Sequence, residues 1–309
     1  MKKNETTITV GIPAYNEEKN IKNLLRSVIM QEEKGFIIQK IKVISDGSTD
    51  QTVKRAKEIK DNRLEITSYK KRIGKSSHLN TLFKNLDTDI LVLFDADVTL
   101  ADKFTIQKLI QPLIKDKKVA LVGGSPEQYS AKTFLEKATQ VGLDTYREMR
   151  LNYKEGHNVY CCIGQILALA KPFAKQTVVA KDVMSNDSFL YFACLTKGFK
   201  FRHVEKAKVL YRAPEKLSDH LKQDQRFTIA KIRLIKIFGN FAKKEYKIPK
   251  KIYYFYMLKG FIRAPIYSVF LFMFNYYSRL LANRDNYKFS EVWPIAWSTK
   301  KGINIFNEK

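Results

Sequence analysis

Two carboxylates stand one residue apart directly after an apolar run in this sequence. Residues 90–94 read Ile-Leu-Val-Leu-Phe, which is typical of a buried strand, and Asp95 and Asp97 follow at once. Burial of an unpaired carboxylate is costly, so two acids directed at one place predict a cation between them. Mg²⁺ and Mn²⁺ bind carboxylate oxygens and leave positions open for phosphate. The pair therefore predicts a Mg²⁺ or Mn²⁺ site, with a chance acidic turn as the alternative.

The segments around these acids alternate between strand and helix patterns. Predicted strands cover 7–13, 41–46, 63–69, 90–95 and 119–124, and predicted helices cover 17–31, 50–60, 75–86 and 103–115. Such alternation predicts an α/β fold in which helices wrap a mostly parallel, Rossmann-like sheet. Later patterns predict helices over 130–153 and 185–198, an apolar segment over 159–170 and a strand over 199–214.

Polar residues follow the predicted strands at the edge where such a sheet binds its ligands. Glu17 follows the first strand, Asp46 ends the second, and Asp95 and Asp97 follow the fourth. We therefore expect one crevice to collect these four acids. Asp46 lies in Ser-Asp-Gly-Ser-Thr-Asp, which fits either a plain turn before a helix or an acceptor for a base or ribose. Lys75 begins a predicted helix, where backbone N–H groups and an ammonium favour phosphate.

The last third of the sequence has a different character. A long basic amphipathic helix is predicted over 216–238, and an aromatic stretch follows over 253–282. Its uncharged part, 264–278, is shorter than the ~20 residues that span a bilayer as a helix. We favour an interfacial or re-entrant anchor on anionic lipid over a buried soluble helix. The expected division is a catalytic domain, 1–215, and a basic, aromatic helical region, 216–309, that associates with the membrane.

The charge balance indicates anionic partners. Lys and Arg number 56 and Asp and Glu number 31, which gives a net charge of +25. Nucleic acid, phosphate-rich substrates and an anionic membrane surface all fit such a charge. Three cysteines without metal-binding spacing favour a reducing compartment, so we expect the cytoplasmic face of the cell membrane. The opening residues lack an apolar core, so no signal peptide is predicted.

In chain order, seven stretches resemble the successive motifs of family 2 glycosyltransferases. They are VGIPAYNEEKNI, VISDGSTDQT, GKSSHLN, LVLFDADV, GGSPE, SNDSFLYFACLTKGFKFRHV and QDQRF. The resemblance covers about residues 8–227, and the ordered set is far more specific than any single stretch. It implies a GT-A fold, inversion at the anomeric carbon, a divalent metal and a nucleotide-diphospho-sugar donor, expected to be a UDP-sugar.

The resemblance also implies roles for individual residues. It assigns donor binding to Pro13, Tyr15, Glu17, Asp46, Lys75, Asp95 and Asp97. Asp97 is the expected direct metal ligand, while Asp95 is expected nearer the ribose and diphosphate and is the second candidate ligand. Where the family often has two acids, Ser45 precedes Asp46 here.

Two further motifs of the resemblance concern the transfer step. Asp187 stands at the family's catalytic base, and Asn186 replaces the Glu that precedes it. Asp187 also fits a helix cap, which is compatible with a base whose pKa the helix N-terminus lowers. Gln223, Arg226 and Phe227 resemble the Gln-x-x-Arg-Trp motif, which lines the acceptor or donor cleft. Phe227 keeps a flat apolar platform but lacks the indole N–H donor.

These patterns lead to one functional hypothesis and its alternatives. We expect a metal-dependent, inverting glycosyltransferase that moves a sugar to a lipid-linked or saccharide acceptor in glycan biosynthesis. A nucleotidyltransferase of related fold is the enzymatic alternative, and it has no need of Asp187. A basic nucleic-acid- or lipid-binding protein without catalysis is the other alternative. Nucleic acid is not the expected partner, because it leaves Asp95 and Asp97 without a role.

Overall fold

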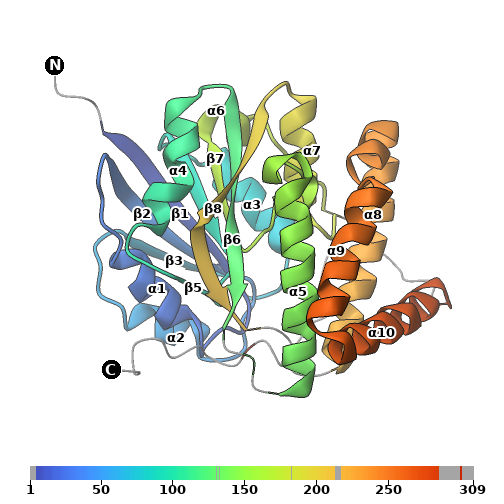
Figure 1. The fold of residues 1–309 in the computed structure, drawn as a ribbon. Helices are drawn as coiled ribbons and strands as arrows, with labels where there is room; N and C mark the ends of the chain where they lie inside the picture. The colour runs from blue at the N-terminus through green and yellow to red at the C-terminus, as the bar shows by residue number, and fades with distance from the viewer. Residues whose placement is uncertain are drawn as a thin grey trace.

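Eight strands of the described residues form one sheet in the order β3-β2-β1-β4-β7-β6-β8-β5. The structure is a computed structural model of the 309-residue chain. It describes residues 5–129, 131, 133–181, 183–212, 217–284 and 300. Helices pack against the sheet, so the chain has the α/β architecture that the sequence predicts (Figure 1).

The first half of the sheet is built from alternating strands and helices. Its elements are β1 (Thr6–Ala14), α1 (Ile21–Ile29), β2 (Phe36–Ser45), α2 (Thr52–Lys57), β3 (Leu64–Ser68), α3 (Lys75–Lys84) and β4 (Ile90–Phe94). β1 pairs in parallel with β2 and β4, and β2 pairs in parallel with β3. The carboxyl ends of β1, β2 and β4 therefore lie at one edge, as the sequence predicts.

The second half differs from the mostly parallel sheet that we expected. Its elements are β5 (Val98–Leu100), α4 (Thr105–Lys115), β6 (Val119–Gln128), α5 (Phe134–Asn152), η1 (Tyr153–Gly156), η2 (Val159–Cys161), β7 (Ile166–Ala170), α6 (Lys171–Lys175), α7 (Asn186–Thr196) and β8 (Lys200–Tyr211). β7 is antiparallel to β4 and β6, β5 is antiparallel to β8, and β6 is parallel to β8. The sheet is mixed because apolar periodicity places a strand but does not give its direction.

The reversed strand β7 has a consequence for the edge where β4 ends. Since β7 runs opposite to β4, it begins beside the residues that follow β4. The backbone N–H of Asp95 donates to the carbonyl of Gln165, just before β7, at 3.3 Å. The segment that leads into β7 is therefore brought next to the Asp-x-Asp pair.

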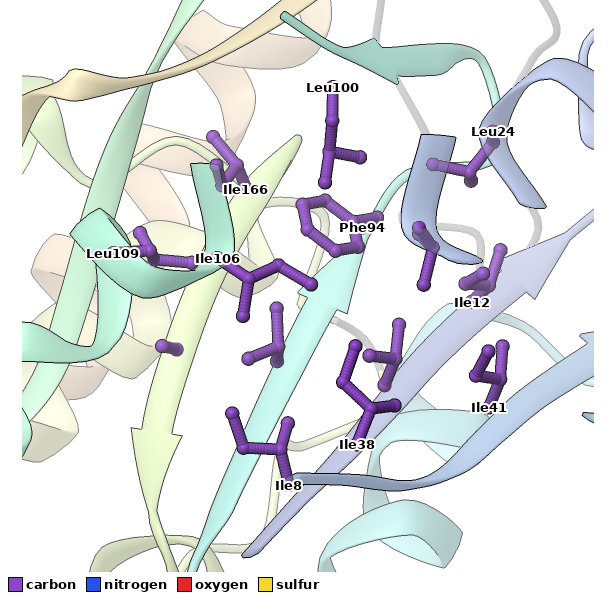
Figure 2. Packing of buried hydrophobic residues seen from close by; sticks show 14 of the residues in the cluster. Ile8, Ile12, Leu24, Ile38, Ile41, Phe94, Leu100, Ile106, Leu109 and Ile166 are labelled. Carbon is purple, nitrogen blue, oxygen red and sulfur yellow. The ribbon is translucent and has the colours of Figure 1, made fainter. Parts of the chain in front are cut away.

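Apolar side chains cover both faces of the sheet and fix the strand ends. On one face, Leu24 of α1 lies in the same cluster as Phe94, the last residue of β4 (Figure 2). On the other face, Leu79 of α3 and Leu190 of α7 belong to a second cluster. Burial of one such side chain contributes about 1.5–3 kcal/mol. The chain is thus held firmly up to the residue before Asp95.

Three helices follow the sheet along one flank of the molecule. They are α8 (Leu217–Glu245), α9 (Lys250–Arg263) and α10 (Pro265–Arg284), and α9 and α10 pack against α5 (Figure 1). α8 is interrupted at Gly239, which has φ 63° and ψ −145°. α9 ends before Pro265, because the residue that precedes a proline disfavours helical backbone angles. The aromatic stretch 253–282 therefore folds as two helices.

Helix α9 is fastened to α5 by close approach and by charge. A Cβ on Gly260 would lie 2.4 Å from Thr145 Oγ1, so a side chain at this position would force the two helices apart. Lys259 and Arg263 pair with Glu148 of α5 at 2.7 and 2.6 Å. These two cations therefore face α5.

The outer surface of α9 and α10 exposes large apolar side chains. Ile262, Ile266 and Phe272 are 73%, 73% and 75% exposed. Within the described ranges, no helix combines the length and the apolar character that crossing a membrane requires. The two helices thus present an apolar surface that the described part of the chain leaves uncovered.

Candidate active site

Residues from five parts of the fold meet at the edge where β1 and β4 end. The cleft there is lined by Pro13, Lys75, Leu79, Leu93, Phe94, Asp95, Gly164, Leu167, Asn186, Asp187 and Leu190. Pro13 comes from β1, Lys75 from the start of α3, and Asp187 from the start of α7. The structure thus brings together four of the predicted site residues, with Asp95 as the fourth.

Lys75 and Asp95 form an ion pair in this cleft. The Lys75 ammonium donates to Asp95 Oδ1, and the two side chains remain 22% and 31% exposed. Gly74 has φ 87°, which favours glycine, and this turn lets Lys75 begin α3 beside the end of β4. Lys75 therefore offsets one carboxylate of the Asp-x-Asp pair.

Asp97 and Glu17 are the two further acids at this edge. Glu17 is buried, and its carboxylate accepts from Asn20 Nδ2 at 2.8 Å and from Lys300. Burial and the charge of Asp97 raise the pKa of Glu17 to about 8. Burial and the charge of Asp95 also raise the pKa of Asp97. In both cases burial is the larger cause and the neighbouring carboxylate the second, and a cation bound here would stabilise the ionised forms.

The carboxylates present fit a divalent cation that binds together with a nucleotide. Within the described part of the chain, no three His, Cys, Asp or Glu side chains gather into a complete metal cage. A hard cation such as Mg²⁺ needs only one or two carboxylates when phosphate oxygens and water complete its shell. Asp95 and Asp97, one residue apart after β4, supply that number.

A lysine from the far end of the chain reaches the same acids. Lys300 Nζ donates to the carbonyl of Tyr15 at 3.0 Å and to the carboxylate of Glu17. Its charge lowers the pKa of Glu17 and of Asp97, against the effect of burial. Lys300 thus supplies part of the positive charge at this edge.

Asp46 is buried, and its carboxylate holds the segment that precedes α3. It accepts from the backbone N–H groups of Ile73 (2.7 Å) and Gly74 (3.2 Å), and His78 Nε2 lies 2.8 Å away. Burial acts to raise the pKa of Asp46, but His78 and the backbone donors outweigh it and hold the pKa below its usual value. Asp46 therefore positions the turn that leads to Lys75, and its contact with a base stays a prediction.

The same segment brings Arg72 onto the ring of Tyr15. The guanidinium carbon lies 3.9 Å from the ring centroid, and Arg72 Nε lies 3.8 Å from Asp46 Oδ2. A guanidinium stacked on an aromatic ring makes a flat, polarisable surface of the kind on which bases stack. Tyr15, Asp46 and Arg72 thus form one connected patch next to the cleft.

Asp187 lies in the first turn of α7, and three hydrogen bonds fix its carboxylate. Gly164 N donates to Oδ2 at 3.0 Å, Ser188 N donates to Oδ1 at 2.8 Å, and Ser185 Oγ also donates to Oδ1. A Cβ on Gly164 would lie 3.6 Å from Asp187 Oδ2 and 3.7 Å from Lys75 Nζ. The carboxylate is therefore held in one orientation close to the Lys75 ammonium.

The Gln-x-x-Arg-Phe motif lies on α8, and its arginine is near the acids of the cleft. Burial lowers the pKa of Arg226, whereas the charges of Asp187 and of the Asp-x-Asp pair raise it. Phe227 is 51% exposed, and the Arg226 guanidinium lies 5.2 Å from its ring centroid. The side chain of Gln223 lies outside the described residues. Arg226 thus joins the cleft acids electrostatically, while Phe227 lies half in solvent.

Several residues that support this site were not predicted. They are Arg72, His78, Gly164, Ser185 and Lys300. Ser185 donates to Asp187 two residues later, which is a local contact. The others act through contacts between segments that are distant in the sequence or through the backbone, so residue spacing gives no sign of them. His78 is buried, and its Nε2 lies 2.8 Å from Asp46 Oδ1. Only Gly164, a glycine just before an apolar run, carries a local signal of close approach.

The fold matches solved structures of GT-A glycosyltransferases. The chain belongs to glycosyl transferase family 2, because the model of that family matches residues 9–176, more than half of the chain. The resemblance read from the seven motifs is therefore confirmed. So are the α/β GT-A fold and the prediction of an enzyme.

The chain is similar to curated glycosyltransferases. It is 26% identical over 227 residues to the poly-beta-1,6-N-acetyl-D-glucosamine synthase of Staphylococcus aureus (strain COL), which covers 71% of this chain and 53% of the relative. It is 32% identical over 152 residues to the UDP-N-acetylglucosamine–dolichyl-phosphate N-acetylglucosaminyltransferase of Methanococcus voltae, which covers 43% and 58%. The matched region thus spans little more than half of each relative.

Solved structures share the fold. The mannosyltransferase PcManGT of Pyrobaculum calidifontis, in complex with GDP-Man and Mn²⁺, matches with a TM-score of 0.62 at 16% identity, over 93% of this chain and 77% of that one. The glucosyl-3-phosphoglycerate synthase of Mycobacterium tuberculosis, with Mn²⁺, UDP and phosphoglyceric acid, gives 0.53 at 17%, over 76% and 79%. Identities this low establish the fold alone.

Proposed function

We propose that this chain is a metal-dependent, inverting glycosyltransferase that uses a UDP-sugar. The observation that carries the proposal is a single cleft that contains Lys75, Asp95 and a firmly held Asp187. Such a cleft joins a site for a diphosphate to a carboxylate base, which is what sugar transfer requires. Because the chain belongs to this family, we set aside both alternatives, the nucleotidyltransferase and the binding protein without catalysis.

The donor is proposed to lie along the edge of the sheet. Tyr15 and Asp46 would hold the nucleoside, with Pro13 and Glu17 beside it. Asp95 and Asp97 would hold Mg²⁺ or Mn²⁺, and that ion supplies positive charge to the diphosphate. Lys75 adds its ammonium where charge develops on the departing nucleoside diphosphate.

The names of two similar proteins support a uridine nucleotide as the donor's carrier, and a third was solved with a guanosine nucleotide. The name of the Methanococcus voltae relative contains UDP-N-acetylglucosamine, and the Mycobacterium tuberculosis enzyme was solved with UDP. The mannosyltransferase of Pyrobaculum calidifontis was solved with GDP-Man. We therefore propose a UDP-sugar as the donor. A GDP-sugar is the alternative donor, and the experiment must distinguish the two.

Asp187 is the proposed general base. It would take the proton of an acceptor hydroxyl while that oxygen bonds to C1 and the bond between C1 and the diphosphate breaks. Attack from the face opposite the leaving group inverts C1, so one base is enough and no sugar–enzyme bond forms. Its hydrogen bonds from Gly164, Ser185 and Ser188 hold the carboxylate in one orientation, so positioning drives this step.

The acceptor is proposed to be lipid-linked or saccharide, as part of glycan or polysaccharide biosynthesis. The names of the two curated relatives, a polysaccharide synthase and a dolichyl-phosphate transferase, support both choices. The region 216–309 would bring the enzyme to the cytoplasmic face of the membrane, in a peripheral position. The exposed apolar surface of α9 and α10 and the net charge of +25 support this placement. Arg226 on α8, with Gln223 and Phe227, would link that region to the cleft.

The test of this function is UDP release from UDP-sugars with Mn²⁺, using a lipid extract and oligosaccharides as acceptors. Asp187→Asn should lower release by about 10²–10⁴-fold, because it removes the base and keeps the shape. The matched control is Asp116→Asn, a 40% exposed acid at the end of α4, which should behave like the wild type. Release that needs GDP-sugars instead would change the donor, and full activity of Asp187→Asn would refute the base.

A further inference from the structure

Lys300 holds its ammonium among the acids at the edge of the sheet. Its Nζ donates to the carbonyl of Tyr15 at 3.0 Å and to the carboxylate of Glu17. The Glu17 side chain is 5% exposed and the Lys300 side chain is 22% exposed, so the ion pair is largely shielded from water. Salt screens a shielded pair only weakly, so the charge of Lys300 also acts on the acids nearby.

One of these acids is the expected metal ligand, Asp97. The charge of Lys300 lowers the pKa of Asp97 more than the charge of Lys75 does, although Lys75 is paired with Asp95, the other acid of the Asp-x-Asp pair. Glu17 and Asp97 also interact, because the charge of Asp97 raises the pKa of Glu17. Lys300 is therefore the stronger of the two lysines in compensating Asp97.

The oxygen atoms around the Lys300 ammonium are of the type that hard divalent cations bind. Such cations take carboxylate and backbone carbonyl oxygens as ligands. Lys300 uses one oxygen of each type, from Glu17 and from Tyr15. An ammonium and a divalent cation at this edge therefore draw on the same negative charge, and each repels the other.

Lys75 and Lys300 differ in how they are held at the edge. Lys75 begins α3, and Asp46 fixes the turn before it through the backbone N–H groups of Ile73 and Gly74. The contacts of Lys300 with Tyr15 and Glu17 are made by its ammonium, at the end of a flexible four-carbon side chain. Rotation of that side chain removes the ammonium and leaves the sheet unchanged. Of the two lysines, Lys300 is thus the one that can leave.

Resting on the metal site of the proposed function, we propose that Lys300 is an internal counter-ion of Glu17 and Asp97, and that a divalent cation bound by the Asp-x-Asp pair displaces it. Lys300 then lowers the affinity of the site for a cation that arrives alone. A cation that arrives with a nucleoside diphosphate brings compensating negative charge, so Lys300 opposes it less. Lys300 thereby favours binding of the metal together with the donor.

The first experiment measures the affinity of the full chain for Mn²⁺ without nucleotide, from the electron paramagnetic resonance signal of free Mn²⁺. Lys300→Ala should bind Mn²⁺ about tenfold more tightly than the wild type, because the competing charge is gone. Saturating UDP should reduce this difference to about threefold or less. Lys300→Arg keeps the charge and should stay within about twofold of the wild type.

The matched control for general electrostatics is Lys19→Ala. Lys19 is exposed and lies two residues after Glu17, so its substitution removes the same charge from the same part of the chain. Because solvent and salt screen an exposed charge, the Mn²⁺ affinity of this variant should stay within about twofold of the wild type.

The second experiment follows Lys300 itself, by acetylation with acetic anhydride and mass spectrometry. Mn²⁺ should increase the acetylation rate of Lys300 by about threefold or more, because release from Glu17 frees the nitrogen. Asp97→Ala should abolish this increase, and the rate at Lys19 should not respond to Mn²⁺.

Thermal melts, which show that each variant is folded, and binding in the presence of UDP separate the possible failures. If Lys300→Ala binds Mn²⁺ no more tightly than the wild type, or if Mn²⁺ leaves the acetylation of Lys300 unchanged, the inference is overturned. The proposed function survives that result as long as Mn²⁺ still binds with UDP. Failure of the folded wild type to bind Mn²⁺ even with UDP overturns the proposed metal site, and the inference with it.

Discussion

The sheet edge and the helical flank are stabilised in opposite ways. At the sheet edge, the carboxylates of Asp46 and Asp187 accept hydrogen bonds from backbone N–H groups, and Asp95 pairs with Lys75. On the flank, residues such as Ile262 and Phe272 expose most of their apolar surface. Hydrogen bonds fix direction, whereas apolar burial requires only contact area. The edge is thus organised within the chain, whereas the described part of the chain leaves the apolar surface of the flank uncovered.

Substitution of Asp46 should destabilise the segment before α3 that its carboxylate holds at the sheet edge. Asp46→Ala leaves the N–H groups of Ile73 and Gly74 without their acceptor and removes the carboxylate that lies 2.8 Å from His78 Nε2, which should cost about 3 kcal/mol of unfolding free energy. Urea unfolding followed by circular dichroism measures this loss. Glu65→Ala, at an acid with a 52% exposed side chain, should change the value by less than about 0.5 kcal/mol. Equal losses in the two variants would refute the special role of Asp46.

The pH dependence of the unfolding free energy tests the burial of His203, which lies on β8. Burial, with the charges of Arg150, His157 and Arg147, lowers the pKa of His203 to about 4. The unfolded chain then binds more protons between the ordinary pKa of His and pH 4. Stability should therefore fall as the pH decreases through this window, by about 3 kcal/mol from this residue. His203→Gln should lose less stability over the same range, and an unchanged pH slope would contradict the account.

Membrane binding tests the exposed apolar surface of α9 and α10. Phe272→Asn should weaken binding to vesicles that contain phosphatidylglycerol by about tenfold, because a 75% exposed phenylalanine loses its apolar contact. Sedimentation with vesicles gives the partition coefficient. Val178→Asn, at an equally exposed apolar position in the catalytic domain, is the control and should bind like the wild type. If both variants bind as tightly as the wild type, the flank is not the docking surface.

The smallest effect is expected at the stacked pair beside the cleft. Arg72→Ala removes the guanidinium that lies 3.9 Å from the Tyr15 ring, and UDP should then bind about threefold more weakly. Lys71→Ala removes the same charge from an exposed neighbour, so it controls for general electrostatics. Comparable losses in both variants would show that charge alone, and not stacking, supports the nucleotide.

The sequence predicted elements that depend on local pattern and missed features that depend on chain direction or distance. The strand before Asp95 and the helix that contains Asp187 in its first turn were placed closely, because apolar spacing is a property of neighbouring residues. The antiparallel β7 was not predicted, since an apolar run reads the same for either direction. The contact of Lys300 with Glu17 joins residues 283 positions apart, and no spacing rule reaches that far. The donor-binding roles stay a prediction, which rests on several motifs that occur in order.

Calorimetric titration with UDP, in Mn²⁺ or in EDTA, tests the central claim that the Asp-x-Asp acids form a metal-dependent donor site. The account predicts that wild type binds UDP with Mn²⁺, that EDTA removes this binding, and that Asp97→Ala loses it while remaining folded. Binding of UDP that is equally tight in EDTA, or that Asp97→Ala retains in full, would contradict the account.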